Sequence, residues 1–299
     1  MVSNTSTEPA GGAAQTFPGR HDGPRRVTVV GPPAASLSGL ASDLSKLARY
    51  RDLLYTLTVH RVKVRYKQSV LGVAWAVLQP LALMLIYTVI FSRVARVPSE
   101  GLPYALFAFT ALLPWLCFST ALTNGTNSLV SHSHLVTKVY FPREILPLTY
   151  VFAAFFDFAV AALILAAMML YYRAGLTANA LWVAPILLVL LVFSTASSLV
   201  FSATQVRFRD IGVAMPLVLQ LWLFATPIVY PLSAVPAWAL VFYRLNPMVG
   251  VVENFRRTLV QGAPPDLPSL ASAAAVSVVL LATSYVYFKR VEATVADVI

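Results

Sequence analysis

Six long apolar segments, separated by shorter polar stretches, run through the chain from about residue 72 onward. Each has about the 20 residues that an α-helix needs to cross a hydrocarbon core of about 30 Å. Their expected bounds are 72–92, 104–124, 147–172, 181–206, 211–231 and 269–288. The pattern therefore predicts an all-α integral membrane protein whose six transmembrane helices form one domain, residues 71–299.

The region before the first apolar segment divides into two parts. Residues 1–42 are rich in Gly, Pro, Ser and Thr and poor in large apolar groups, so we expect a disordered cytoplasmic tail without a cleavable signal peptide. Residues 43–70 form a basic segment in which leucines recur at helical spacing over 43–60. This spacing is typical of an amphipathic helix in the membrane interface, although an ordinary soluble helix shows it too.

Residues 232–268, between the fifth and sixth apolar segments, are mostly apolar but interrupted by Pro and Gly. We call them the gate segment and expect two short helices that re-enter the outer leaflet. Non-helical backbone at that depth must be buried in protein or line a cavity, so such helices would form the lid of a pathway. A helix pair lying flat on the outer surface is the alternative.

Composition and charge support a membrane protein and set its orientation. The chain is 58% hydrophobic and 11% charged, with a mean hydropathy of +0.73, whereas soluble domains carry about 25% charged residues. With the N-terminus inside, 16 of the 22 Lys and Arg residues fall on the cytoplasmic side, and both termini are cytoplasmic. The net charge of +10 does not indicate nucleic acid, because the cations cluster beside the spans.

Four cations stand directly before the first apolar segment, namely Arg61, Lys63, Arg65 and Lys67. Each cation near an anionic lipid surface contributes about 1 kcal/mol of attraction. The cluster therefore marks the cytoplasmic boundary of the membrane and is a candidate site for a negatively charged lipid.

Residues 129–145, here called the coupling segment, form the cytoplasmic loop after the second span and mix apolar with polar groups. Its candidate contact residues are His132, His134, Lys138, Tyr140, Phe141, Arg143 and Glu144. A short amphipathic helix here could fit a groove on a cytosolic partner, with Tyr140 and Phe141 as aromatic anchors. Composition alone favours a plain connecting loop. His132 and His134 have no third ligand nearby, so no metal site is expected.

The spans contain one acid and several aromatic residues of interest. Asp157 in the third span either pairs with a neighbouring helix or subunit, which we favour, or relays protons. The aromatic set Trp75, Tyr87, Phe91 and Trp222 either belongs to the interfacial belts or stacks on sugars in a channel.

Catalytic motifs are absent from the sequence. It has no GxxxxGK[ST] phosphate loop, no nucleophile motif and no pair of carboxylates on one membrane face. We therefore expect a transport protein without catalytic residues or a bound cofactor, in which an ion gradient or another subunit supplies the energy for transport. A proton-coupled transporter using Asp157 and an enzyme acting on polyprenyl-linked sugars are the alternative functions.

Four segments, in order, carry a family resemblance that covers about residues 50–290: VRYKQSVLGVAW (64–75), TKVYFPREILPL (137–148), RFRDI (207–211) and RLNPMVGVVENFR (244–256). Together they resemble the permease subunit of ABC-type polysaccharide exporters, which move O-antigen, teichoic acid, capsule or cell-wall galactan. The resemblance implies a homodimer in the bacterial inner membrane with two ATPase subunits, which bind ATP and Mg. The implied substrate is a glycan on a polyprenyl pyrophosphate. The excess of Arg over Lys, 17 to 5, and the abundance of Ala suggest a GC-rich genome, which puts a galactan first and an O-antigen second.

The resemblance also suggests roles for particular residues. It implies that residues 129–145 couple to the ATPase and that residues 61–67 lie near the entrance for the lipid pyrophosphate. Residues 246–262 match the external gate helices, which makes Asn246, Glu253 and Arg256 gate residues.

Overall fold

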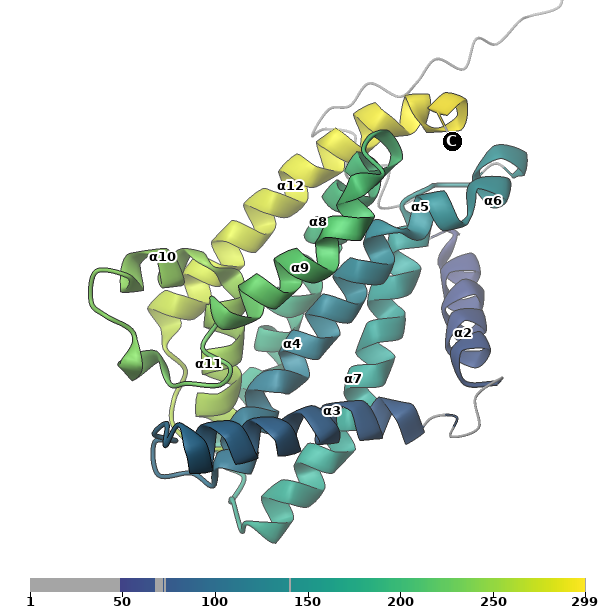
Figure 1. Ribbon diagram of the computed structural model, residues 1–299. Helices are drawn as coiled ribbons and strands as arrows, with labels where there is room; N and C mark the ends of the chain where they lie inside the picture. The colour runs from purple at the N-terminus through teal and green to yellow at the C-terminus, as the bar shows by residue number, and fades with distance from the viewer. Residues whose placement is uncertain (1–48, 68–71, 73, 140, 299) are drawn as a thin grey trace, which may run out of the picture. The chain divides into compact units, whose positions relative to one another are not determined.

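The computed structural model describes residues 49–67, 72, 74–139 and 141–298, and all of its regular elements are helices (Figure 1). These residues belong to one compact unit, Ala34–Ile299. The expected tail, residues 1–42, and the beginning of the expected basic segment lie outside the described residues. No strand occurs among the residues described, which confirms the predicted all-α class.

Five helices of the described part are long and apolar enough to cross a membrane, and they match five of the six predicted segments. They are α3 (Ala74–Tyr87) with its continuation η2 (Thr88–Val94), α4 (Tyr104–Thr126), α7 (Ile145–Tyr171), η3 (Ala178–Trp182) with α8 (Val183–Arg207), and α12 (Leu267–Val298). Pro103 precedes α4 as its N-cap residue, and the bounds of the long helices lie within a few residues of those predicted, except at the longer α12.

The fifth predicted segment, 211–231, is helical only over α9 (Asp210–Phe224). Fifteen helical residues span about 22 Å, which is less than the core of a bilayer. The predicted helix to residue 231 is therefore wrong at its C-terminal end, where Pro227 lacks an amide donor and disfavours the helical conformation of the residue before it. Even so, the chain of this segment joins two distant parts of the fold. Gly212 is bonded to Gln205 of α8, and Ser233 is bonded to Glu100, which follows η2.

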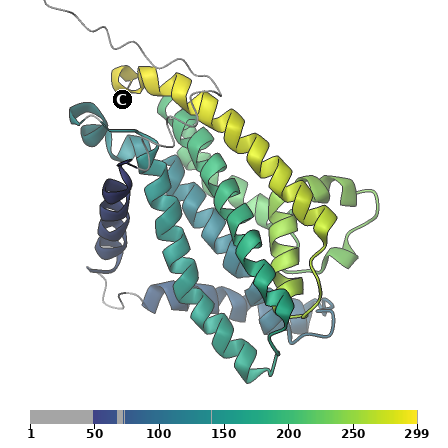
Figure 2. The same ribbon diagram turned by 180° about the vertical axis from the view of Figure 1, so that it is seen from behind.

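Helix α2 (Arg51–Lys67) begins near the end of the molecule that holds the coupling segment and runs beside α7 (Figures 1 and 2). Its first turns pack on a core cluster through Leu53, Leu54 and Leu57, as does Tyr50 directly before the helix. Its C-terminal part reaches Asp157, which follows Ile145 by twelve residues, or about 18 Å along α7. This part of α2 therefore lies along α7, and an interfacial position of the expected amphipathic helix, 43–60, stays a prediction.

Helix α4 lies at the centre of the unit, against α3, α7, α8, α9 and α11. Its close approach to α8 depends on Gly125, because a Cβ at this position would lie 2.6 Å from the Ser198 hydroxyl oxygen. Small residues allow such close packing of helices in membranes, where apolar burial does not drive association. Phe118 and Phe193 stack across the same interface with their ring centroids 4.9 Å apart.

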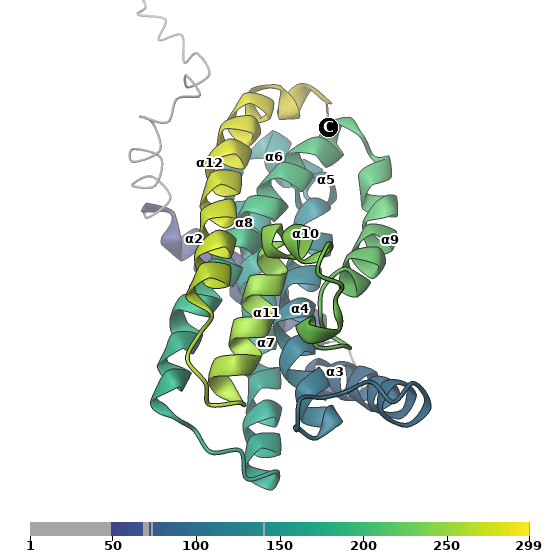
Figure 3. The ribbon, with the colours of Figure 1, turned by 90° about the vertical axis from the view of Figure 1, so that its left-hand side faces the viewer.

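The gate segment contains η4 (Leu232–Ala234), α10 (Leu240–Leu245) and α11 (Pro247–Leu259), so it forms the two short α-helices that the sequence predicts (Figure 3). The break between them is at Asn246, whose side-chain oxygen accepts a hydrogen bond of 3.1 Å from the Met248 amide, while Pro247 starts α11. This is ordinary N-cap chemistry. Most of α11 is buried against α4, α8 and α12. Re-entry of these helices into a leaflet stays a prediction.

Candidate functional site

The four cations before the first span all lie on α2, but they face different surroundings. Arg61 and Arg65 are four residues apart, so they share one face of the helix, and both contact the body of the protein. Lys63 and Lys67 are exposed. The structure thus divides the predicted cluster into two arginines that face the protein and two lysines that stay free for solvent or lipid headgroups.

Arg65 and Tyr66 both bind the carboxylate of Asp157 in the middle of α7. The Arg65 guanidinium donates to Oδ2, and the Tyr66 hydroxyl donates to Oδ1 over 2.5 Å. Burial and the bond to Asp157 raise the pKa of Tyr66 to about 12, so its phenol stays a donor at neutral pH. The favoured interpretation of Asp157, pairing with a neighbouring helix, is confirmed.

Arg61 joins α2 to the coupling segment. Its guanidinium contacts Nε2 of His132 and lies over the ring of Tyr150 in α7, 4.4 Å from the centroid. The Nδ1 of His132 donates to the carbonyl of Ser128 over 2.8 Å, which leaves Nε2 as the acceptor for Arg61. Burial, together with the nearby Arg61 charge, lowers the pKa of His132 below its usual value, so the ring is neutral at pH 7.

Two neighbouring cavities lie beneath α2. The larger cavity, of about 320 Å³, is bounded by α2, α3, α4 and α7 and has both apolar and polar walls, including Trp75, Gln79, Leu113 and Phe158. The smaller cavity, of about 190 Å³, is lined by Arg61, Asn124 and Tyr150 among others. Both cavities share the Arg65 and Asp157 side chains as part of their walls, so this ion pair lies at the boundary between them.

The coupling segment forms two short helices, α5 (Ser128–Ser131) and α6 (Ser133–Lys138). His134 and Lys138 are exposed on α6, where a partner can reach them. Phe141 is instead 6% exposed and packs in a core cluster with α8 and α12, so its ring is not presented as a surface anchor. Tyr140 lies outside the described residues.

Arg143 and Glu144 tie the end of the coupling segment to α12. The Lys289 ammonium donates to both carboxylate oxygens of Glu144 over 3.0 Å and to Glu292 over 2.8 Å. The Arg143 guanidinium donates to the backbone carbonyl of Glu292 over 2.6 Å. Burial is the main cause that raises the pKa of Glu144, with the Glu292 charge adding to it. This network fixes the coupling segment to the last span, and Lys289 and Glu292 were not identified as site residues from the sequence.

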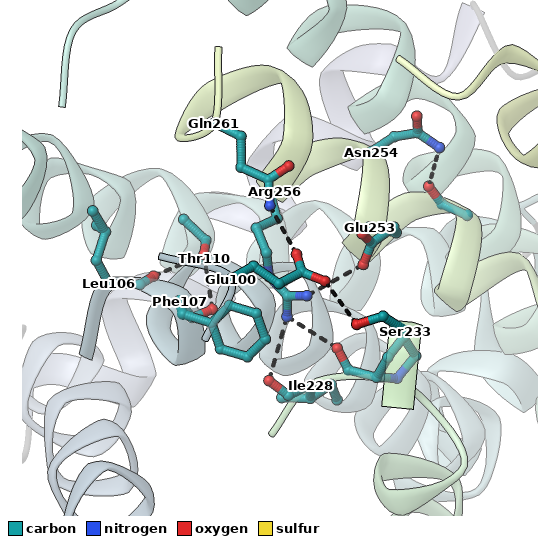
Figure 4. Close-up of polar contacts among 12 residues, drawn as sticks. Glu100, Leu106, Phe107, Thr110, Ile228, Ser233, Glu253, Asn254, Arg256 and Gln261 are labelled. Atoms are coloured by element: carbon teal, nitrogen blue, oxygen red, sulfur yellow. Dashed lines mark hydrogen bonds and ion pairs between the residues drawn. The ribbon is translucent and has the colours of Figure 1, made fainter. Parts of the chain in front are cut away.

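At the opposite end, Arg256 of α11 is fully buried (Figure 4). Its guanidinium pairs with Glu253 over 3.2 Å and donates to the carbonyls of Pro227 and Ile228 over 3.0 and 3.4 Å. These bonds hold α11 against the turn that follows α9. Two predicted gate residues, Glu253 and Arg256, are therefore brought together, while Asn246 caps the same helix.

Glu100 forms a second connection beside Arg256 and was not identified from the sequence. Its carboxylate accepts hydrogen bonds of 3.1 Å from Ser233 and 3.0 Å from Gln261, which lie on either side of α10 and α11 (Figure 4). Glu100 has a positive φ of 54° at the turn before α4, a conformation uncommon for a residue other than glycine. The sequence shows only an acid in a short loop, which does not reveal its partners.

The aromatic candidates occupy three different environments. Trp75 is 53% exposed and lines the larger cavity. Tyr87 and Phe91 meet edge to face with their centroids 5.9 Å apart. Trp222 packs against Trp115, Phe118 and Phe193 within the subunit. Whether any of them lines a channel stays a prediction. In the described part of the chain, no three His, Cys, Asp or Glu side chains are grouped as a metal site.

Comparison with known proteins places these features in context. Residues 52–260 match a family model described as "ABC-2 type transporter". The chain is 34% identical over 250 residues to the O-antigen export system permease protein RfbA of Myxococcus xanthus, which covers 83% of this chain and 95% of that protein. A Klebsiella pneumoniae protein of the same name is 31% identical over 215 residues, 71% of this chain and 81% of its own length. The polysialic acid transport protein KpsM of Escherichia coli is 23% identical over 211 residues, 69% and 80% of the two chains.

Proposed function

Because the chain belongs to the ABC-2 type transporter family, we propose that it is the permease of an ATP-driven exporter that carries a polyprenyl-pyrophosphate-linked polysaccharide outward across the bacterial inner membrane. The observation that carries this proposal is the position of α2. One of its cations, Arg65, lines a cavity with both polar and apolar walls, and another, Arg61, contacts the coupling segment. This arrangement fits an amphiphilic, negatively charged substrate and transport that is powered by a cytosolic partner.

The substrate class follows from the chemistry of this end of the protein. Arginine binds phosphate oxygens in charge-assisted, often bidentate pairs, and lysine adds a mobile point charge. The four cations Arg61, Lys63, Arg65 and Lys67 supply both kinds of contact along 61–67. A polyprenyl chain requires an apolar surface, which the larger cavity and the adjoining lipid offer. The relatives' names support a polysaccharide, and we propose a galactan first and an O-antigen second.

The proposed assembly contains two copies of this chain and two ATPase subunits that bind ATP and Mg. We propose six crossings per copy with both termini in the cytoplasm, although α9 alone is too short to be a full span. The bonds from Gly212 to Gln205 and from Ser233 to Glu100 support this count, because they fix the two ends of the fifth segment at opposite ends of the fold. The turns at residues 225–231 then complete the crossing.

ATP binding acts on transport by favouring one arrangement of the permease over another. We propose that the ATPase contacts the coupling segment at its exposed residues His134 and Lys138. Arg143 and Glu144 would pass the displacement to α12, and His132 would pass it to α2. At the outer side, α10 and α11 would form the gate, with Glu253 and Arg256 fixing α11 to the end of the fifth segment.

Two other functions are kept as alternatives. A proton-coupled transporter would use Asp157, but that carboxylate is already bound by Arg65 and Tyr66. Replacing it with Asn would abolish gradient-driven transport if this alternative were correct. An enzyme acting on polyprenyl-linked sugars would need membrane-proximal acids for catalysis, and the sequence has only 12 Asp and Glu residues in total.

Purification of the full chain from its native host tests the proposal. We expect an ATPase subunit to co-purify and ATP hydrolysis to be absent from the isolated chain. Depletion of the chain in cells should leave lipid-linked glycan in the cytoplasmic leaflet. ATP hydrolysis by the isolated chain, or glycan export that is unchanged by depletion, would exclude this function.

Replacement of His134 and Lys138 together, the exposed residues of α6, tests the coupling segment. Export should fall while ATP hydrolysis by the complex continues. A matched change at Arg173, in the short connection between α7 and η3 at the opposite end, should leave both activities unchanged. Unchanged export in the double variant would remove the coupling role from these two residues.

A further inference from the structure

Asp157 is a carboxylate inside a transmembrane helix, and its hydrogen-bond partners indicate its role. A charged side chain at that depth is costly and normally serves a bundle interior, a partner or a wet cavity. Its oxygens accept from Arg65 and Tyr66, both of which belong to α2 rather than to another span. Within the described residues, therefore, the hydrogen bonds of the Asp157 side chain serve to attach α2 to α7.

The bond between Arg65 and Asp157 can be exchanged for a bond to another anion. No side chain of α2 is fully buried, and the side chain of Arg65 is 42% exposed while that of Asp157 is 19% exposed. A guanidinium that is partly exposed while it is paired can be reached by a second anion before the first pair separates. Arg65 can therefore change partner without unfolding the subunit.

The ion pair also stands where a ligand would have to pass. Arg65 and Asp157 line both the larger and the smaller cavity, together with Thr120 and Ala154. The walls of the larger cavity include the apolar side chains of Leu113 and Phe158. Separation of Arg65 from Asp157 would join the two spaces and release a guanidinium into them, while Tyr66 could remain bonded to the carboxylate.

We propose that Asp157 is the exchangeable counter-ion of the lipid-pyrophosphate entrance: it holds Arg65 against α7 while the entrance is empty, and the diphosphate takes Arg65 from it. This inference rests on the proposed function and assigns Asp157 as a positioning residue. A diphosphate carries more charge and more acceptor oxygens than one carboxylate, and guanidinium groups bind phosphate in a bidentate manner. No proton needs to move, which separates this role from a proton relay.

Binding of undecaprenyl pyrophosphate to the full chain in its complex with the ATPase, reconstituted in nanodiscs, tests the exchange. Asp157→Asn removes the competing charge and keeps an acceptor for Tyr66, so it should bind the lipid about threefold to tenfold more tightly than wild type. Arg65→Gln should bind about tenfold more weakly. In the Arg65→Gln background, Asp157→Asn should have no further effect, because the guanidinium for which Asp157 and the diphosphate compete is then absent.

Lys63→Gln is the matched control, since it removes an exposed cation of the same helix that faces away from Asp157. Asp157→Asn should tighten binding in the Lys63→Gln background as much as in wild type. Equal tightening in the Arg65→Gln background would overturn the inference and indicate a general charge effect. Unchanged or weaker binding by a folded Asp157→Asn variant would also overturn it.

Two further comparisons identify the anion that binds and show whether the proposed substrate or only the exchange is wrong. Inorganic pyrophosphate represents a free diphosphate, and nanodiscs of phosphatidylglycerol represent a lipid with a single phosphate. We expect inorganic pyrophosphate to compete with undecaprenyl pyrophosphate for binding and phosphatidylglycerol to compete little. If wild type binds no undecaprenyl pyrophosphate, the proposed substrate fails together with this inference. If wild type binds it and Asp157 has no effect, only the exchange fails.

If the Asp157→Asn variant does not fold, the exchange can still be tested in protein that keeps both Arg65 and Asp157. A spin label at Val64, which is 47% exposed on α2, should become more mobile when undecaprenyl pyrophosphate is added, because α2 loses the ion pair between Arg65 and Asp157 of α7. A label at Leu163, which is 71% exposed further along α7, should not change. An unchanged signal at Val64 at saturating lipid would overturn the exchange.

Discussion

The guanidinium carbon of Arg256 lies 3.7 Å from the centroid of the Phe107 ring, and both side chains are fully buried. The cation therefore joins α11 of the gate segment to α4 at the centre of the fold. Its other partners are the Glu253 carboxylate and two backbone carbonyls after α9. A cation–aromatic contact strengthens when it is removed from water, and the remaining charge is balanced by Glu253.

Arg256→Gln should destabilise the protein strongly. The change leaves Glu253 without its cation and leaves the carbonyls of Pro227 and Ile228 with fewer donors, and loss of one partner of a buried pair costs about 3–5 kcal/mol. Thermal unfolding of the purified protein in detergent measures the effect. Arg257→Gln in the same helix is the control and should cost less than Arg256→Gln, because Arg257 is half-buried and its guanidinium donates to the exposed carbonyl of Pro264 rather than pairing with a buried carboxylate. Equal effects of the two changes would contradict the role of Arg256.

Gly250→Ala should loosen the packing of α11 on α12. A Cβ at this position would lie 2.7 Å from the Ala273 side chain and 2.8 Å from the Ser269 carbonyl oxygen, and the second contact is with backbone that cannot turn away. Overpacking of this kind costs about 1–3 kcal/mol. The free energy of unfolding of Gly175→Ala should stay unchanged within about 0.5 kcal/mol, since nothing lies within 4 Å of a Cβ there.

Glu144 and Lys289 should show an energetic coupling in a double-mutant cycle. Lys289→Met alone leaves Glu144 buried without its main cation, and Glu144→Gln alone leaves Lys289 with Glu292 only. The double variant should be more stable than the sum of the single effects predicts, by about 0.5–3 kcal/mol. Unfolding in detergent gives the four stabilities. Arg290, which is exposed, replaces Lys289 in the control cycle and should give a coupling near zero.

Stability should fall on acidification through His132. Its pKa is lowered in the folded protein, so the unfolded chain takes up a proton first, near the ordinary pKa of about 6.5. The contribution of neutral His132 is thus fully present above that pH and is lost as the pH falls through the folded pKa. Thermal unfolding between pH 7.5 and 5.5 should show a shallower loss for His132→Gln than for wild type. His134→Gln, at an exposed position of α6, should retain the wild-type slope.

The amino-acid sequence by itself determined the class of the protein and the position of its spans. Runs of about 20 apolar residues leave few alternatives to membrane helices, because backbone polar groups in lipid must be satisfied within the segment. The interruption of the gate segment by Pro and Gly was likewise readable, and at Pro247 it separates α10 from α11, because the loss of an amide is a local effect. The predicted extent of this helix was less accurate, because the apolar run continues past Phe224 whereas α9 ends there, and hydropathy alone does not mark a helix end.

Only the tertiary structure decided which polar groups meet. Arg65 and Asp157 are 92 positions apart, and Lys289 and Glu144 are 145 positions apart, so no local periodicity connects them. The same holds for the burial of Phe141, an aromatic side chain that the sequence placed at a partner surface. The energy of a charge in a membrane depends on its partner and on its access to water, and both are set by the packing of helices that are distant along the chain.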